Sequence, residues 1–350
     1  MTLTLLRPAP IEKASIRNVD ASEEPRAVAQ SLLAGNVRRL TTTYAAGVAV
    51  LDALNAAMKP PGKGSSYAAR RAHSRRVRAT ALRLVAPVFE HRVLLEGAEP
   101  NGLLGDLYPD QHRFDLPFIE VQALHGANQR HIKGVPLAVL GHSVHPFYGT
   151  YAPARTTHLE LFGTWLSQYA GRRAHAVDVG TGCGVLAFML AKAGFERVTA
   201  TDNNPNATES VRRELKRLPH ASAVTPVCAD LLEAAPGSPD LVVFNPPWTR
   251  GETDDILDQA LCFQDGLFER FFDQAAAAMA PDGRVIIVFS NIIRLVQPDV
   301  PHPIDAELAG DRFRLVQRLQ RKVKPTRGSD GSQRRTREKV EVWELALAAP

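Results

Sequence analysis

Residues Ala174–Gly184, AHAVDVGTGCG, decide the fold class of this chain. The stretch 174–179 is apolar apart from His175 and Asp178, which predicts a buried strand, and glycines follow at 180, 182 and 184. Glycine lets a backbone take positive φ and pass close to a ligand. A helix is expected to follow directly, over 184–193, and its start would offer unpaired N–H groups. We therefore expect a nucleotide-type loop at the carboxyl end of a strand.

The same strand, turn and helix order continues after this loop. Helices are expected at 205–218 and 266–279, and strands at 197–201, 223–227, 241–244 and 284–289. Such alternation is typical of a parallel, doubly wound α/β sheet. Two later apolar runs, 313–319 and 340–347, predict an antiparallel pair joined by the basic loop 325–337.

The first part of the chain has a different pattern. Residues 22–58 predict two helices broken near Gly35, and the Pro, Gly and Ser residues of 59–66 predict a loop. Short apolar runs between 84 and 144, such as 118–124 and 135–140, predict strands. We therefore expect an α+β N-terminal domain over residues 1–134, followed by an α/β domain over residues 135–350.

Composition excludes several classes of protein. Of the 350 residues 45% are hydrophobic and 23% charged, as in soluble globular proteins, and no apolar run approaches the roughly 20 residues of a membrane span. The N-terminus does not resemble a signal peptide, and three cysteines without ligand spacing favour a reducing, cytoplasmic setting. His142 and His145 lack a Cys or acidic partner at ligand spacing, so no metal is expected.

Charge is unevenly distributed along the chain. Residues 1–150 carry 18 Lys and Arg against 12 Asp and Glu, residues 151–320 carry 16 against 21, and residues 321–350 carry 8 against 4. Two basic parts thus flank an acidic middle, which indicates either an anionic partner such as nucleic acid or packing of the ends against the middle. Arg71, Arg75 and Arg78 would share one face of a helix, either as a phosphate-binding strip or as a solvated face.

The D-x-G-x-G-x-G spacing of 178–184 resembles motif I of class I S-adenosylmethionine (SAM) dependent methyltransferases; a dinucleotide fingerprint would place the third glycine one residue later. The resemblance implies a Rossmann-like sheet with SAM as cofactor and S-adenosylhomocysteine as product. It also implies that acids at successive strand ends contact the cofactor, Asp202 at the ribose hydroxyls and Asp230 at the adenine amino group. Each acid alone could equally cap a helix. The cofactor-binding residues implied are Asp178, Gly180, Thr181, Gly182, Gly184, Asp202, Asn203, Asp230, Leu231 and Asn245.

The tetrapeptide Asn245, Pro246, Pro247, Trp248 directly follows the strand expected at 241–244. Two prolines cannot continue a sheet, so a rigid turn is expected there. The tetrapeptide resembles the [DN]-P-P-[YFW] motif of methyltransferases that act on nitrogen attached to a planar system. The resemblance implies that the Asn side chain and the first proline's carbonyl accept the two hydrogens of an amide or exocyclic amine, while the aromatic ring stacks on it. These four residues are the predicted catalytic residues.

From about residue 135 to 347 the chain is similar to the HemK-type glutamine methyltransferases and to rRNA enzymes with a "small" methyltransferase domain. In these families the segment before the first strand returns over the active site, which here implies substrate contacts from Tyr148, Tyr151, Pro153 and Arg155, together with Trp248. HemK-type enzymes carry Pro-Arg-Pro-x-Thr-Glu in this segment, whereas this chain reads APARTTH over 152–158. That departure argues against glutamine as the acceptor.

Three functions are compatible with these features. The first is an N-methyltransferase acting on a macromolecule, RNA (ribosomal RNA foremost) before protein glutamine, with the basic N-terminal domain holding the substrate. The second is a methyltransferase for a small metabolite, in which the N-terminal domain acts as a lid. The third is a SAM-binding protein without turnover, which the complete NPPW turn disfavours.

Overall fold

The computed structural model describes residues 4–12, 16–62, 65–153, 155–218, 221–253, 260–323 and 337–348. The chain forms two compact units: Leu5–Ile132, here called the N-terminal unit, and Lys133–Pro350 with Met1–Thr4, here called the C-terminal unit. Within the described residues, no helix has both the length and the apolar character needed to cross a membrane.

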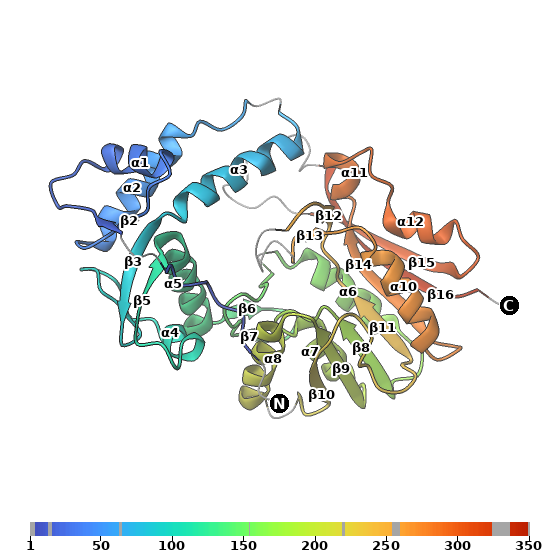
Figure 1. Ribbon diagram of the computed structural model, residues 1–350. Helices are drawn as coiled ribbons and strands as arrows, with labels where there is room; N and C mark the ends of the chain where they lie inside the picture. The colour runs from blue at the N-terminus through green and yellow to red at the C-terminus, as the bar shows by residue number, and fades with distance from the viewer. Residues whose placement is uncertain are drawn as a thin grey trace. The chain divides into compact units, whose positions relative to one another are not determined.

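A seven-stranded sheet forms the centre of the C-terminal unit (Figure 1). Its strands lie in the order β10-β9-β8-β11-β14-β16-β15; those from β10 to β14 are parallel, and β16 runs antiparallel to both neighbours. The strands are β8 His175–Val179, β9 Arg197–Asp202, β10 Val224–Cys228, β11 Leu241–Phe244, β14 Arg284–Ser290, β15 Phe313–Lys322 and β16 Lys339–Leu347. The predicted Rossmann-like, mostly parallel sheet with an antiparallel C-terminal hairpin is confirmed. The loop predicted to join that hairpin, 325–337, lies outside the described residues up to position 336.

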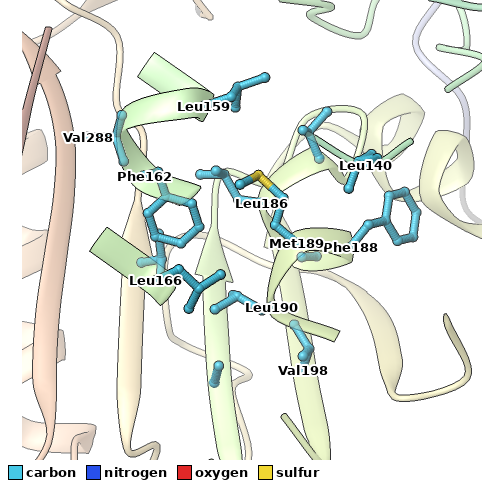
Figure 2. Packing of buried hydrophobic residues seen from close by; sticks show 14 of the residues in the cluster. Leu140, Leu159, Phe162, Leu166, Leu186, Phe188, Met189, Leu190, Val198 and Val288 are labelled. Carbon is cyan, nitrogen blue, oxygen red and sulfur yellow. The ribbon is translucent and has the colours of Figure 1, made fainter. Parts of the chain in front are cut away.

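Helices cover both faces of this sheet. One face carries α6 Thr157–Gln168, α7 Val185–Lys192 and α8 Pro205–Arg217; the other carries α10 Leu267–Ala278, α11 Ile292–Val296 and α12 Pro303–Leu308. Successive residues of β11 alternate between the two cores, as strand geometry requires. Figure 2 shows the first core, where α6 and α7 meet through Phe162 and Leu186. Two short pairs complete the unit: β6 Val135–Leu137 with β7 His142–Val144, and β12 Thr249–Arg250 with β13 Cys262–Phe263.

The N-terminal unit is an α+β structure with a five-stranded sheet. Strand β1 pairs in parallel with β2, and β2 pairs in parallel with β3. Both β4 and β5 pair antiparallel with β3. The strands are β1 Arg17–Asn18, β2 Arg38–Arg39, β3 Leu84–Phe89, β4 Arg92–Val93 and β5 Arg113–Pro117, and the helices are α1 Pro25–Leu33, α2 Tyr44–Ala57, α3 Tyr67–Ala81, α4 Leu103–Leu107 and α5 Phe118–Lys133. The expected helix pair broken near Gly35 is present as α1 and α2.

One predicted strand of this unit is wrong. Residues 118–124 form the first half of α5 instead. The buried residues Phe118, Val121 and Leu124 recur every third position, which fits a helical face, whereas a half-buried strand would bury every second residue. Pro117 already ends β5, so the apolar run that follows belongs to the next element. The strand expected over 135–140 is shorter, ending at Leu137.

Candidate functional site

Parallel pairing brings the predicted site residues to one edge of the C-terminal sheet. β8 lies between β9 and β11, so the glycine loop after β8 has Asp202 on one side and Asn245 on the other. The register places Val179, the last residue of β8, opposite both Thr201 and Phe244. Asp230 follows β10, the outermost strand on the β9 side. Ligand sites of open α/β sheets lie at this carboxyl edge.

The loop after β8 has the backbone that its glycines predict. Gly180, Gly182 and Gly184 have φ values of +62°, +54° and +84°, in the left-handed region that side chains disfavour. A Cβ on Gly184 would lie 2.8 Å from the Phe188 ring, so this position also needs glycine for space. A Cβ on Gly182 would meet only the Tyr151 carbonyl oxygen, at 3.6 Å. The N-terminus of α7 therefore follows a sharply turned loop with free space beside Gly182.

Asp178 is buried below this loop, and only one of its two carboxylate oxygens accepts hydrogen bonds from described atoms. Its Oδ2 accepts hydrogen bonds from Thr181 Oγ1 at 2.7 Å and from the Ala187 amide at 3.0 Å. Its Oδ1 is buried without a partner among the described atoms. Burial raises the pKa of the carboxyl to about 7, because the charged form loses its hydration. Asp178 thus offers an acceptor that a cationic ligand group would satisfy.

Asp202, at the end of β9, is tied to the same loop. Its Oδ2 accepts from the Gly182 amide and its Oδ1 from the Asn204 amide, both at 2.9 Å. Each carboxylate oxygen has two lone pairs, so both retain capacity for a further donor. Burial raises its pKa to about 6. The neighbouring Asn203 is exposed.

Asp230 and Leu231 lie at the next strand end. Asp230 forms an exposed ion pair with Arg270, at 3.4 Å, and so is held less firmly than Asp202. Leu231 is buried and has a φ of +48°, which is unusual for a residue with a side chain. A positive φ at a residue with a side chain is a strained conformation.

The NPPW turn follows β11, and its Asn and Trp are joined. The indole N–H of Trp248 donates to Asn245 Oδ1 at 3.2 Å. Because the indole nitrogen can only donate, this bond orients the amide of Asn245 with Oδ1 toward Trp248. Pro246 is buried, and Trp248 is half-buried against the apolar cores of both sheet faces. The turn is therefore a fixed unit whose Asn oxygen keeps one lone pair for another donor.

His158 is a neighbour of the NPPW turn that the sequence did not predict. Its ring meets Trp248 edge-on, with centroids 5.5 Å apart and an interplanar angle of 89°. Burial lowers the pKa of His158 to about 4, so the ring is neutral near pH 7. It belongs to the quoted segment 152–158, but a histidine at a helix start has no pattern that singles it out.

The segment before α6 lies along α8, from its N-cap to its last turn. Side-chain amides of Asn204 and Asn206 donate to the carbonyl oxygens of Gly149 and Tyr148, at 2.9 and 3.0 Å. Ser210 and Glu214 accept from the amides of Phe147 and His145 at 3.1 and 2.9 Å. These four residues of α8 and its cap pin the segment beside Gly182.

The predicted substrate residues of this segment differ in their surroundings. Tyr148 is buried, and burial raises the pKa of Tyr151. Pro153 is buried as well. Arg155 forms an ion pair with the buried Glu338 at 3.0 Å, which ties the segment to the residue preceding β16.

A family model and several relatives match the C-terminal unit. The methyltransferase small domain model matches residues 160–297. A ribosomal protein L11 methyltransferase from Heliobacterium modesticaldum is 32% identical over 135 residues, which cover 39% of this chain and 37% of that protein. A tRNA1(Val) (adenine(37)-N6)-methyltransferase from Porphyromonas gingivalis is 26% identical over 37% of this chain and 55% of that protein. A protein assigned as an N5-glutamine methyltransferase, from Methanocaldococcus jannaschii, is 27% identical over 33% of this chain and 61% of that protein.

The chain thus spans between about a third and three fifths of the length of these relatives. The matched range runs from α6 to the residue after α11 and includes the glycine loop, Asp202, Asp230 and the NPPW turn. Residues 160–297 of this chain, which hold the candidate site, are therefore similar to the methyltransferase small domain family.

Proposed function

We propose that this protein is a SAM-dependent N-methyltransferase that modifies a nitrogen on a planar amide or exocyclic amine. The observation that carries the proposal is the order β9-β8-β11 in the sheet. In this order the glycine loop after β8 lies between Asp202, a carboxylate that could accept ribose hydroxyls, and the NPPW turn, which could hold a nitrogen on a planar group. The family match over residues 160–297 supports the same activity.

The residues after β8 and β9 suit SAM. SAM carries an ammonium group, and the unpartnered Oδ1 of buried Asp178 is an acceptor for a cation. Gly180, Thr181, Gly182 and Gly184 would pass along the cofactor, while Asp202 would accept its ribose hydroxyls through the remaining lone pairs. We assign Asn203, Asp230 and Leu231 to the adenosine end. When bound, SAM supplies the methyl group from its sulfonium centre.

The NPPW turn would hold the acceptor nitrogen. The free lone pair of Asn245 Oδ1 and the Pro246 carbonyl would accept the two N–H hydrogens, which turns the nitrogen lone pair toward the methyl donor. Pro247 keeps the turn rigid, and Trp248 supplies a ring face for the planar group, with stacking of roughly 1–3 kcal/mol for a base. Tyr148, Tyr151, Pro153 and Arg155 would line or frame the acceptor side. The transferred methyl replaces a proton, which passes to solvent.

The acceptor belongs to a macromolecule in this proposal. The relatives are named as methyltransferases of a ribosomal protein, of glutamine and of a tRNA adenine, and all three acceptors are protein or RNA. We place residues 1–134 as the substrate-recognition domain and residues 135–350 as the catalytic domain, working in the cytoplasm on RNA before protein.

Transfer of label from methyl-labelled SAM tests this function. Cell extract from a strain lacking the protein is divided into RNA, protein and small-molecule fractions, and each is incubated with wild type, Asn245→Ala or Asn55→Ala. Asn55 is an exposed residue of α2 and serves as the matched control. We expect label in the RNA or protein fraction with wild type and the control, and a loss of at least about 100-fold with Asn245→Ala at unchanged SAM affinity. Full transfer by Asn245→Ala, or label only in small molecules, would contradict the proposal.

A further inference from the structure

The chain that follows the NPPW turn is held from two sides. Strand β12 begins directly after Trp248 and pairs in parallel with β13. On that side the Gly251 amide donates to the Phe263 carbonyl of β13 at 3.0 Å. Because successive peptide groups of a strand point to opposite sides, the amide and the carbonyl of Arg250 point away from β13. The outer side of β12 therefore presents one donor and one acceptor.

The side-chain amide of Gln297 pairs with both of these groups. The Arg250 amide donates to Gln297 Oε1 at 2.8 Å, and Gln297 Nε2 donates to the Arg250 carbonyl at 2.7 Å. Both distances are those of ordinary hydrogen bonds. A carboxamide carries a donor and an acceptor on one carbon, so a single side chain takes the place of a third strand beside β12.

The backbone of Gln297 is itself anchored in the fold. Gln297 is the C-cap of α11, and its amide donates to the Ile293 carbonyl at 2.8 Å. Ile293 is fully buried in the apolar core on its face of the sheet. Since α11 follows β14, the neighbour of β11, it begins at the same sheet edge as the NPPW turn. Gln297 thus connects the chain beside that turn to the core.

The start of α11 is tied to the other predicted acceptor-side segment. Asn291 Oδ1 accepts from the Lys339 amide at 2.8 Å, and Asn291 Nδ2 donates to the Arg337 carbonyl at 3.2 Å. Between these two residues lies Glu338, the buried partner of Arg155. Helix α11 is therefore bound at its start beside the anchor of Arg155 and at its end beside the NPPW turn.

The position of Gln297 favours a role in geometry over a role in stability. Its side chain is only half-buried, so water reaches both backbone groups of Arg250 when the amide is removed, and the cost in stability is small. The fixed position of the chain two residues after Trp248 is lost all the same. Methyl transfer is sensitive to such a loss, because a displaced acceptor nitrogen no longer faces the methyl donor.

We propose that Gln297 is a positioning residue for the acceptor-binding turn. Its amide clamps Arg250 and thereby holds Asn245 and Trp248 in place relative to the glycine loop. This inference rests on the proposed function and deepens it, because it adds a residue outside the NPPW motif that determines the geometry of the acceptor. Gln297 acts through β12 alone. A contact that only stabilises a surface strand is the competing explanation, and the experiment separates the two.

Acrylamide quenching of Trp248 fluorescence tests the clamp in the full-length protein. Wild type and Gln297→Met are each compared with the same protein carrying Trp248→Phe, and the difference isolates Trp248 from the buried Trp165 and Trp343. Methionine keeps the length of the side chain but cannot pair with Arg250. We expect the quenching constant of Trp248 to rise at least about twofold through local opening, and the melting temperature to stay within about 2 °C of wild type.

Initial rates of methyl transfer measure the consequence for the reaction. The acceptor is the RNA or protein fraction of cell extract that takes up label, supplied at limiting and at saturating amounts. We expect Gln297→Met to lower the saturated rate about fivefold, the size of one net hydrogen bond, and to change the half-saturating amount and the Kd of SAM less than about twofold. Gln297→Glu accepts from the Arg250 amide but cannot donate to its carbonyl, so its rate should fall in between.

Gln320→Met is the matched control. Gln320 is an exposed residue of β15 whose side chain donates to Glu341 at 3.1 Å, so the same substitution removes a hydrogen bond elsewhere in the C-terminal unit. We expect this variant to match wild type in both assays.

Three results would overturn the inference. They are an unchanged quenching constant of Trp248 in Gln297→Met, an equal rise in Gln320→Met, and a slower transfer that is matched by an equally weakened affinity for SAM, which would indicate a general loss of structure. Quenching requires neither SAM nor acceptor, so a wild type that transfers no methyl group contradicts the proposed function and leaves the clamp measurable. Normal transfer by Gln297→Met contradicts the positioning role alone.

Discussion

At the scale of single residues, Asp178 links stability to cofactor binding. Its folded pKa of about 7 lies above the ordinary 3.8, so its contribution to stability is present below about pH 4 and is lost as pH rises through 7. Asp178→Asn removes the buried charge, and the new amide can still accept from Thr181 and Ala187. We expect the variant to melt several degrees higher than wild type at pH 8 but to bind SAM at least about tenfold more weakly.

Thermal melts at pH 5 and pH 8 with SAM titration calorimetry measure both effects. Asp282→Asn, an exposed carboxylate of the same unit, is the control and should match wild type. An Asp178→Asn protein that melts no higher than wild type at pH 8 would show that the carboxyl is not strained by burial.

The bond between Trp248 and Asn245 gives a second prediction at this scale. Trp248→Phe keeps a stacking ring but loses the N–H that orients Asn245 Oδ1. A hydrogen bond of about 1 kcal/mol corresponds to roughly fivefold, so we expect kcat to fall about that much with little change in acceptor KM. Trp248→Ala should raise KM as well, because the stacking face is gone. Steady-state kinetics on the identified acceptor decide this, and a fully active Phe variant would contradict the orienting role.

At the scale of elements, the sheet and its strand-end residues were predictable because they obey local rules. The glycines at 180, 182 and 184 require positive φ, and the double proline must end β11, whatever the rest of the chain does. Residues 118–124 resemble a strand by their apolar content, whereas the three-residue spacing of their buried side chains fits a helix. Contacts such as His158 with Trp248, 90 residues apart, depend on packing between elements, which no local pattern contains.

The hydrogen bonds that hold the segment before α6 against α8 also connect two elements. Glu214 is buried and holds the His145 amide at 2.9 Å, and this segment carries Tyr151 beside Gly182. Glu214→Ala leaves the amide without its acceptor, so we expect a loss of about 1–3 kcal/mol in the free energy of unfolding and a higher KM for SAM. Glu214→Gln retains an acceptor and should behave nearly as wild type. Urea unfolding with SAM kinetics tests this, and equal behaviour of Ala and Gln would refute it.

At the scale of the whole molecule, the two units divide the proposed work. The C-terminal unit contains the seven-stranded sheet and the helices that cover it, with one apolar core on each face of the sheet. The N-terminal unit contains a separate sheet and helix α3, which carries five arginines. The two possible roles of the N-terminal unit predict different effects on SAM affinity. A lid that closes over the cofactor would contribute to SAM binding, whereas a surface that recognises RNA would not.

Removing the N-terminal unit therefore distinguishes recognition from closure. A protein comprising residues 133–350 retains the glycine loop, Asp202 and the NPPW turn, and we expect it to fold and to bind SAM within about threefold of the full chain, since its sheet is covered on both faces by its own helices. We expect its affinity for a labelled RNA hairpin to fall at least about tenfold, because the proposed recognition domain is gone. Calorimetry with SAM and anisotropy with RNA measure the two affinities. A folded fragment that loses SAM binding but keeps RNA binding would assign the N-terminal unit to closing the cofactor site.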